Sequence, residues 1–295
     1  MINMTEAIIG SNNTVPSSLT QVGITTKYTF LDYFRSRRFF ILLTITLLIG
    51  TLLTVMVGYY RPESFLTSDL DFYANWWGNS ATYVIILSGI FFGGDAIAGE
   101  FQNKTGYFGL PNPIRRLSVY IGKLLAAFSA ATVILGVFTA VTVTNGLYYF
   151  GLNVPYQFGE SVLFAWFYLA AVLGFTFFFS SLFKSTSMST IVTAILFLFA
   201  FSLIQTLVST LVQIEPWFIL TYGAQIIGNV LTVPYPLHKV VSNFGPGGGA
   251  GAGIGAISLT TFNVQIPEGL AIIGIYFMVT AILGLVLFER KEFTG

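Results

Sequence analysis

The chain has 295 residues, of which 55% are hydrophobic and only 8% are charged, and its formal net charge is +1. Soluble domains carry about 25% charged residues, so this chain has too few charges to cover the surface of a soluble protein of its size. The composition predicts a membrane protein, and the near-neutral charge favours neither nucleic acid nor an acidic partner. The absence of cysteine excludes disulfides and thiolate metal sites, and a single histidine excludes any site with two imidazoles.

Residues 1–26 are predicted to be a disordered cytosolic tail. Its start is polar, rich in Ser, Thr and Asn, and lacks the pattern of a secretory signal. Residues 27–38 are predicted to be an amphipathic interfacial helix on the inner membrane surface, because Tyr28, Leu31 and Phe34 recur at helical spacing. Two interpretations stay open for this helix: an anchor whose arginines fix the orientation of the chain, or a docking helix for a cytosolic partner.

Six stretches are long and apolar enough to cross a bilayer core of about 30 Å, which needs about 20 helical residues. Their continuous runs of Leu, Ile, Phe and Ala lack the alternation of a β-barrel, so transmembrane helices are predicted. Together they form an all-α, six-helix transmembrane domain over residues 39–295. The predicted spans are residues 39–58, 82–99, 119–145, 161–183, 188–213 and 269–288.

A seventh apolar stretch, between Pro216 and Pro234, is too short to be predicted as a span. With six spans and the N-terminus inside, eleven of the 13 Lys and Arg residues lie on the cytoplasmic side. A seventh span would place Arg290 and Lys291 outside, against this bias. The stretch is therefore predicted to be a re-entrant or interfacial element in an outer loop over 214–268, with both termini cytosolic. A glycine-rich run in the same loop is predicted to be a flexible linker.

The second predicted span ends in a Gly-Gly-Asp sequence, and its Asp95 admits two interpretations. An acid costs about 2.5–3.5 kcal/mol at the membrane midplane and less near the interface. Asp95 therefore lies in the headgroup region, or it is paired with a buried donor or with a partner protein. The spacing of the residues does not separate these possibilities.

The next segment, residues 100–118, is the largest predicted cytosolic connection. It mixes aromatic with basic residues, and Pro111 and Pro113 predict a turn within it. Aromatic side chains on the aqueous side, such as Tyr107 and Phe108, indicate burial against another protein or the membrane surface.

An ordered pattern runs through this region: Asp95-x-Ile97-x-x-Glu100, Thr105-Gly106, Pro113-Ile114-x-Arg116 and Gly122-Lys123. The pattern resembles the integral-membrane permease subunit of ABC-2 type transporters. The amphipathic helix, the six spans, the loop after the second span and the re-entrant stretch extend the resemblance across the chain. The family more often has Gly-Thr where this chain has Thr-Gly.

The resemblance implies a permease of the plasma membrane that serves as an exporter subunit, with no enzyme activity of its own. Such permeases pair with a second copy or a paralogue and sit on separate ATP-binding-cassette subunits, which bind ATP and Mg²⁺, so no cofactor is expected on this chain. The chain has no Walker A sequence, which agrees with ATP being bound elsewhere. The residues implied to couple to the ATPase are Asp95, Glu100, Thr105, Gly106, Pro113, Arg115 and Arg116.

Polar residues on the fifth predicted span indicate a transport pathway. Ser202, Gln205 and Ser209 share one helical face, and spans two and five line the pathway in the family that the chain resembles. The alternative is that Ser and Thr bond back to their own helix or aid packing, although an amide such as that of Gln205 needs several partners. The lone His238 is expected to be a solvated or locally bonded residue of the outer loop.

Two other functions stay open. A secondary transporter usually carries ionisable groups at mid-membrane, and the predicted spans have none apart from Asp95 near one end. A non-transporting membrane anchor, or scaffold, of a multi-subunit complex also fits the sequence of the cytosolic segment.

Overall fold

A computed structural model of the chain describes residues 17–103, 115–244 and 257–291. Within this described part, six helices are long and apolar enough to cross a membrane by length and composition. The prediction of an all-α protein with six candidate membrane-spanning helices is therefore confirmed. These candidate spans are Arg37–Tyr60, Asp69–Gln102, Arg116–Phe150, Tyr156–Leu182, Thr186–Val212 and Ile266–Arg290.

The first helix, α1 (Ser18–Arg35), precedes the spans and begins nine residues earlier than predicted. Ser17 caps it, because its Oγ accepts a hydrogen bond of 3.3 Å from the backbone N–H of Thr20. Residues 18–26 are therefore helical, which corrects the prediction of a disordered tail over 1–26. The predicted end at residue 38 is also wrong, because Ser36 has an extended backbone and caps the next helix instead.

The second span is broken into several pieces. Its helices are α4 (Asp69–Tyr73), the π-helix η1 (Ala74–Gly78), α5 (Asn79–Gly93) and α6 (Ala98–Gln102). It starts well before residue 82, the predicted start, because Trp76 and Trp77 are fully buried in the bundle. The indole N–H of Trp77 donates to Oγ of Ser161 at 2.9 Å, so the polar group of this buried side chain has a hydrogen-bond partner inside the protein.

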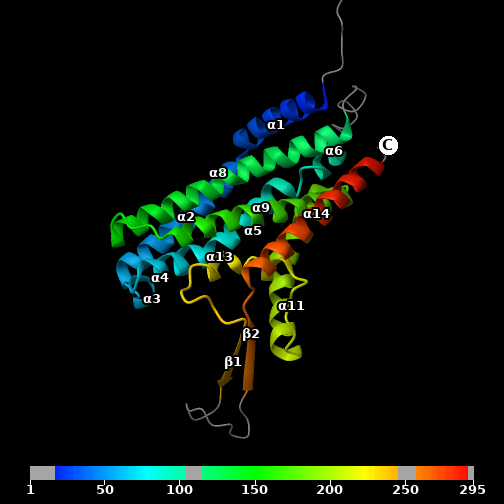
Figure 1. The fold of residues 1–295 in the computed structure, drawn as a ribbon. Coiled ribbons are helices and arrows are strands. Elements are labelled where there is room, and N and C mark those ends of the chain that lie inside the picture. The colour runs from blue at the N-terminus through cyan, green and yellow to red at the C-terminus, as the bar shows by residue number, and fades with distance from the viewer. Residues whose placement is uncertain (1–16, 104–114, 245–256, 292–295) are drawn as a thin grey trace, which may run out of the picture.

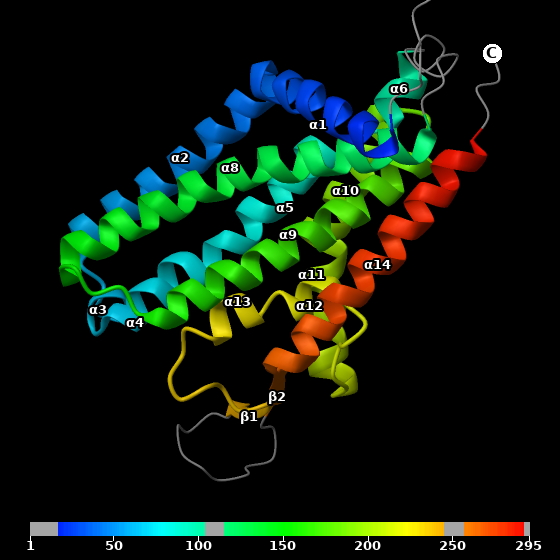
Figure 2. The ribbon, with the colours of Figure 1, turned by 45° about the horizontal axis from the view of Figure 1, so that its top comes forward.

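The fourth span, α9, is the central helix of the bundle and packs against the second, third, fifth and sixth spans, whereas the first span packs against the second and third (Figure 2). The first span is α2 (Arg37–Tyr60), followed by the short α3 (Glu63–Leu66). The third, fourth and sixth spans are α8 (Arg116–Phe150), α9 (Tyr156–Leu182) and α14 (Ile266–Arg290). The fifth combines α10 (Thr186–Ile195), η2 (Leu196–Ala200), α11 (Phe201–Leu207) and η3 (Val208–Val212).

Glycine residues allow α5 and α9 to pack closely. Gly89 and Gly93, four residues apart on α5, face Val172 and Thr176 of α9. A Cβ atom added at Gly93 would lie 2.8 Å from Cβ of Thr176, which is closer than carbon atoms approach without displacement. This spacing of small residues is typical of helix contacts in membranes, where close packing replaces the hydrophobic effect as the driving force.

The stretch between Pro216 and Pro234 forms no long helix. It contains the short helices α12 (Leu220–Gly223) and α13 (Ile226–Asn229), which pack against α14, α9 and η1. Its position relative to a membrane stays a prediction. An antiparallel hairpin that the sequence did not predict follows, with β1 (Lys239–Phe244) paired to β2 (Ile257–Phe262). The glycine-rich run between these strands lies outside the described residues.

The two ends of the bundle carry different elements (Figure 1). The end that carries α1, α6 and the last turn of α14 is called the α1 end. The opposite end, which carries α3, α4 and the projecting β1–β2 hairpin, is called the hairpin end.

Candidate functional site

The candidate site lies at the α1 end, where residues 94–97 form a turn that separates α5 from α6. The backbone N–H groups of Ile97 and Ala98 both donate to Oγ of Ser180, at 2.9 Å each. Ser180 belongs to α9 and is fully buried. A side chain of the central helix therefore caps α6, satisfying N–H groups that the start of a helix leaves unpaired.

Replacing Ser180 by alanine is expected to destabilise the protein by about 1–3 kcal/mol, because two buried N–H groups lose their acceptor. Thermal unfolding of the purified chain in detergent measures this. Ser129→Ala is the matched control, since the Ser129 hydroxyl donates to the Leu125 carbonyl of its own helix at 2.8 Å. Equal melting temperatures for the two variants would contradict the capping role.

Asp95, within the turn, forms an ion pair with Arg38 at the start of α2. Of the two interpretations of Asp95, the structure supports a paired carboxylate, although the Arg38 side chain is half exposed rather than buried. The other carboxylate oxygen, Oδ1, is buried and has no hydrogen-bond partner among the described residues. Beside this pair, a cavity of about 330 Å³ lies between α5 and α10, lined in part by Ile90, Phe91 and Thr190.

Further polar contacts join α6 to its neighbours. Glu100 on α6 pairs with Lys123 on α8, and Nζ of Lys123 also donates to the Ala96 carbonyl at 2.8 Å. Oε1 of Gln102 accepts a hydrogen bond of 2.7 Å from the backbone N–H of Thr186, at the start of α10. With the Ser180 cap, α6 is therefore joined to α8, α9 and α10.

The same end holds α1 against the bundle. The Tyr33 hydroxyl donates to the Phe92 carbonyl at 2.9 Å, and burial raises the pKa of this phenol, so it stays a donor at neutral pH. The Thr26 hydroxyl donates to the carbonyl of Gly122 on α8 at 3.2 Å. A Cβ atom at Gly122 would lie 2.6 Å from Cβ of Thr25, so glycine is needed where α1 crosses α8.

Two basic side chains cap the carboxyl ends of helices here. Nη1 of Arg116 donates to the carbonyls of Glu289 at 2.7 Å and Lys291 at 3.1 Å, at the end of α14. Nζ of Lys291 donates to the Phe183 carbonyl, at the end of α9, at 2.8 Å. Unpaired carbonyls at a helix end carry partial negative charge, which such cations stabilise. Burial, and then the charge of Lys184, lowers the pKa of Lys291 to about 8.

The predicted coupling residues separate into two groups. Those that the structure describes all lie at the α1 end: Asp95, Glu100, Arg115 and Arg116. The others lie outside the described residues: Thr105, Gly106 and Pro113. Sequence reasoning missed Ser180, because a serine near the end of a span is common and nothing in the sequence relates it to α6. Contact with an ATPase stays a prediction for every member of both groups.

The predicted pathway residues lie on the fifth span, most of which is exposed. Oγ of Ser209 donates to the Gln205 carbonyl at 2.7 Å, which is the helix-bonding alternative. Oε1 of Gln205 accepts a hydrogen bond of 3.3 Å from the hydroxyl of Thr221 on α12. Ser202 is exposed. The structure thus brings one of the three, Gln205, against the Pro216–Pro234 stretch, and a pathway role stays a prediction.

The fold and this polar end define a polytopic helical membrane protein in which a broken second span packs on the central helix α9. A protein-family model described as ABC-2 family transporter protein matches residues 25–293, which is most of the chain. The chain therefore belongs to the ABC-2 transporter family, as the sequence pattern indicated. No curated protein matches it.

Family membership establishes the chain as the multi-pass membrane permease component of an ABC-2 transporter. The permease domain lacks the ATPase, which implies an ABC ATPase as a partner. The family thereby favours the permease over the secondary transporter and over the non-transporting scaffold.

Proposed function

We propose that this permease serves an exporter, that its α1 end faces the cytosol, and that the ATPase contacts α1 and residues 100–118. One observation carries the proposal: α6, which leads into that segment, is joined by polar contacts to α8, α9 and α10. A force applied by the ATPase to this segment would therefore reach three spans at once, instead of bending a free loop.

The distribution of basic residues supports a cytosolic α1 end. Of the 12 Lys and Arg residues that the structure describes, ten lie on α1, at the start of α2, in or just before the first turns of α8, between α9 and α10, or at the end of α14. These segments meet at the α1 end (Figure 1), whereas Arg61 follows α2 and Lys239 begins β1. Cytoplasmic segments of membrane proteins carry such an excess of Lys and Arg.

The fifth span supports pairing with a second copy or a paralogue. Its most apolar stretch is only 11% buried, whereas that of α9 is 61% buried. Large apolar side chains such as Phe199, Leu203 and Leu211 are exposed along it. We propose that a second permease packs on this face and that Ser202, Gln205 and Ser209 line the pathway between the two.

The absence of cysteine in the chain allows a direct test of orientation. Asn103→Cys places one thiol at the exposed end of α6, and Leu152→Cys places one at a residue of the hairpin end that is 95% exposed. In intact cells, a membrane-impermeant maleimide is expected to label Leu152→Cys and to label Asn103→Cys only after permeabilisation. Labelling of Asn103→Cys in intact cells would reverse the proposed topology.

A further inference from the structure

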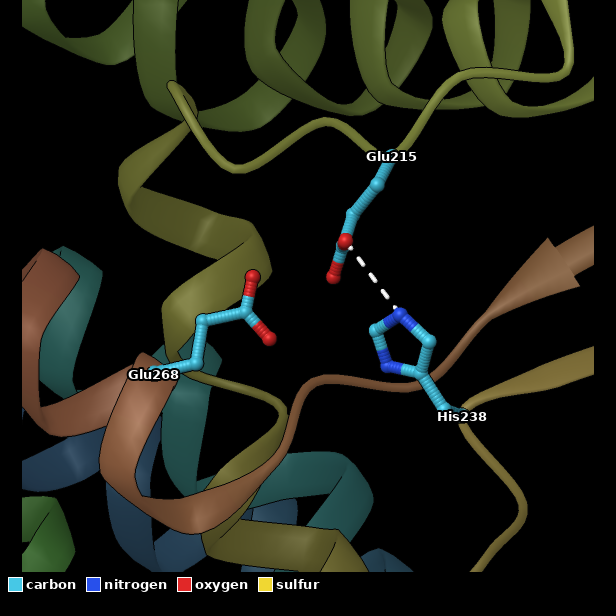
Figure 3. A group of neighbouring side chains, drawn as sticks. All are labelled: Glu215, His238 and Glu268. Atoms are coloured by element: carbon cyan, nitrogen blue, oxygen red, sulfur yellow. Dashed lines mark ion pairs between the residues drawn. The ribbon is translucent and has the colours of Figure 1, made fainter.

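Three side chains capable of binding a metal meet at the hairpin end (Figure 3). Glu215 follows η3, His238 precedes β1, and Glu268 lies in the first turn of α14. One ligand atom from each lies within 4.8 Å of the other two. The lone histidine, expected to be a solvated or locally bonded loop residue, thus faces two carboxylates from two other segments.

The spacing fits a small transition-metal ion. Zinc binds histidine nitrogen and carboxylate oxygen at about 2.0–2.2 Å, so neighbouring ligands of a tetrahedral ion lie about 3.4 Å apart. Nε2 of His238 lies 3.3 Å from Oε2 of Glu215. The carboxylate of Glu268, the third ligand, lies at most 4.8 Å from the other two ligand atoms, so its flexible side chain must move by no more than about 1.4 Å to reach this spacing.

A buried phenol orients the first of these carboxylates. The hydroxyl of Tyr222, a fully buried residue of α12, donates to Oε1 of Glu215 at 2.6 Å. This bond leaves Oε2 directed at His238, as Figure 3 shows. Carboxylates that bind metals are commonly held by such an outer hydrogen-bond donor, which fixes the position of the oxygen before the ion arrives.

The charge of the three ligands also favours binding of a cation. When they bind a metal, two carboxylates and one imidazole contribute two negative charges in total, which a divalent ion neutralises. An imidazole ligand favours zinc and similar transition metals over Ca²⁺ and Mg²⁺, which prefer oxygen ligands. The His238 side chain is 46% exposed and that of Glu215 is 23% exposed, so an ion can enter from solvent, and water can complete its coordination.

We propose that Glu215, His238 and Glu268 bind one divalent transition-metal ion and that this ion fastens the base of the β1–β2 hairpin to the bundle. The three ligands come from the segment before α12, the start of the hairpin and the start of α14. A metal ion shared by these segments would restrict the movement of the hairpin relative to α14.

Titration of the purified, chelator-treated full chain in detergent with ZnCl₂ tests the proposal by calorimetry. One ion per chain is expected to bind. Tyr222→Phe is expected to weaken binding by about 10- to 100-fold, the usual effect of losing an outer hydrogen-bond partner. His238→Ala and Glu268→Gln, which each remove a ligand, are expected to weaken it further. Glu160→Gln, which neutralises an exposed carboxylate of the hairpin end outside the cluster, serves as the control with unchanged affinity.

Cobalt absorption gives a second readout, which reports the ligands of the bound ion and not only its affinity. Co²⁺ added to the wild-type chain is expected to give visible absorption typical of a site with nitrogen and oxygen ligands, and His238→Ala is expected to remove it. The proposal is wrong if the folded wild-type chain does not bind zinc. It is also wrong if His238→Ala and Glu268→Gln both bind zinc as tightly as the wild-type chain does. Neither result would bear on the orientation or on the ATPase contact, which cysteine labelling and ATP hydrolysis test separately.

Discussion

Substitution of Gly93 by valine is expected to separate α5 from α9 and to destabilise the protein by about 3 kcal/mol, the upper end of the usual range for overpacking. The added methyl groups would meet Thr176, a fully buried residue on the central helix of the bundle. Thr176 has little room to give way, because its hydroxyl also bonds to the Leu173 carbonyl at 3.0 Å. Thermal unfolding followed by size-exclusion chromatography in detergent measures the loss.

Gly136→Val is the matched control, because it makes the same chemical change within α8. A Cβ atom at Gly136 would meet nothing within 4 Å, so the substitution causes no clash. Its effect is expected to stay within about 0.5 kcal/mol, as for other exposed helical positions. Equal destabilisation by the two valines would show that helix propensity, and not close packing, decides the outcome.

Removing the charge of Glu100 is expected to give the largest effect on function, under the proposal that α6 transmits force from the ATPase. A hydrogen bond to a charged group contributes about 1.5–3 kcal/mol, which corresponds to a change of about 10- to 100-fold. Glu100→Gln is therefore expected to lower transport-coupled ATP hydrolysis by that factor in the reconstituted complex. The ATPase is expected to remain bound, because the substitution leaves its proposed contacts with α1 unchanged.

Two further variants separate the pairing of Glu100 from its charge. The exchange Glu100→Lys with Lys123→Glu restores an ion pair between α6 and α8, so it is expected to recover part of the activity. Glu289→Gln removes an exposed carboxylate at the same end and is expected to leave hydrolysis unchanged. Hydrolysis that stays at the wild-type rate in Glu100→Gln would contradict the role of this contact in coupling.

The predicted starts of α1 and of the second span were wrong because tertiary contacts stabilise helical turns that the local sequence pattern does not indicate. Residues 18–26 look like a polar tail, yet they are helical because α1 can pack on α8 at Gly122. Residues 69–81 are less apolar than a typical span, yet they continue the second span because Trp76 and Trp77 are buried by neighbouring helices. In both places the helix is stabilised by packing against a distant segment, which a local hydropathy pattern does not report.

The sequence by itself determined that six apolar helices are available to cross a membrane and that a polar segment follows the second one. Both are local properties, because a run of about 20 apolar residues must form a helix to satisfy its backbone in lipid. Only the tertiary structure decided which polar groups meet: Ser180 with Ile97, Lys123 with Glu100, and His238 with Glu215. These pairs depend on how the helices are arranged around α9, and no spacing along the chain encodes that arrangement.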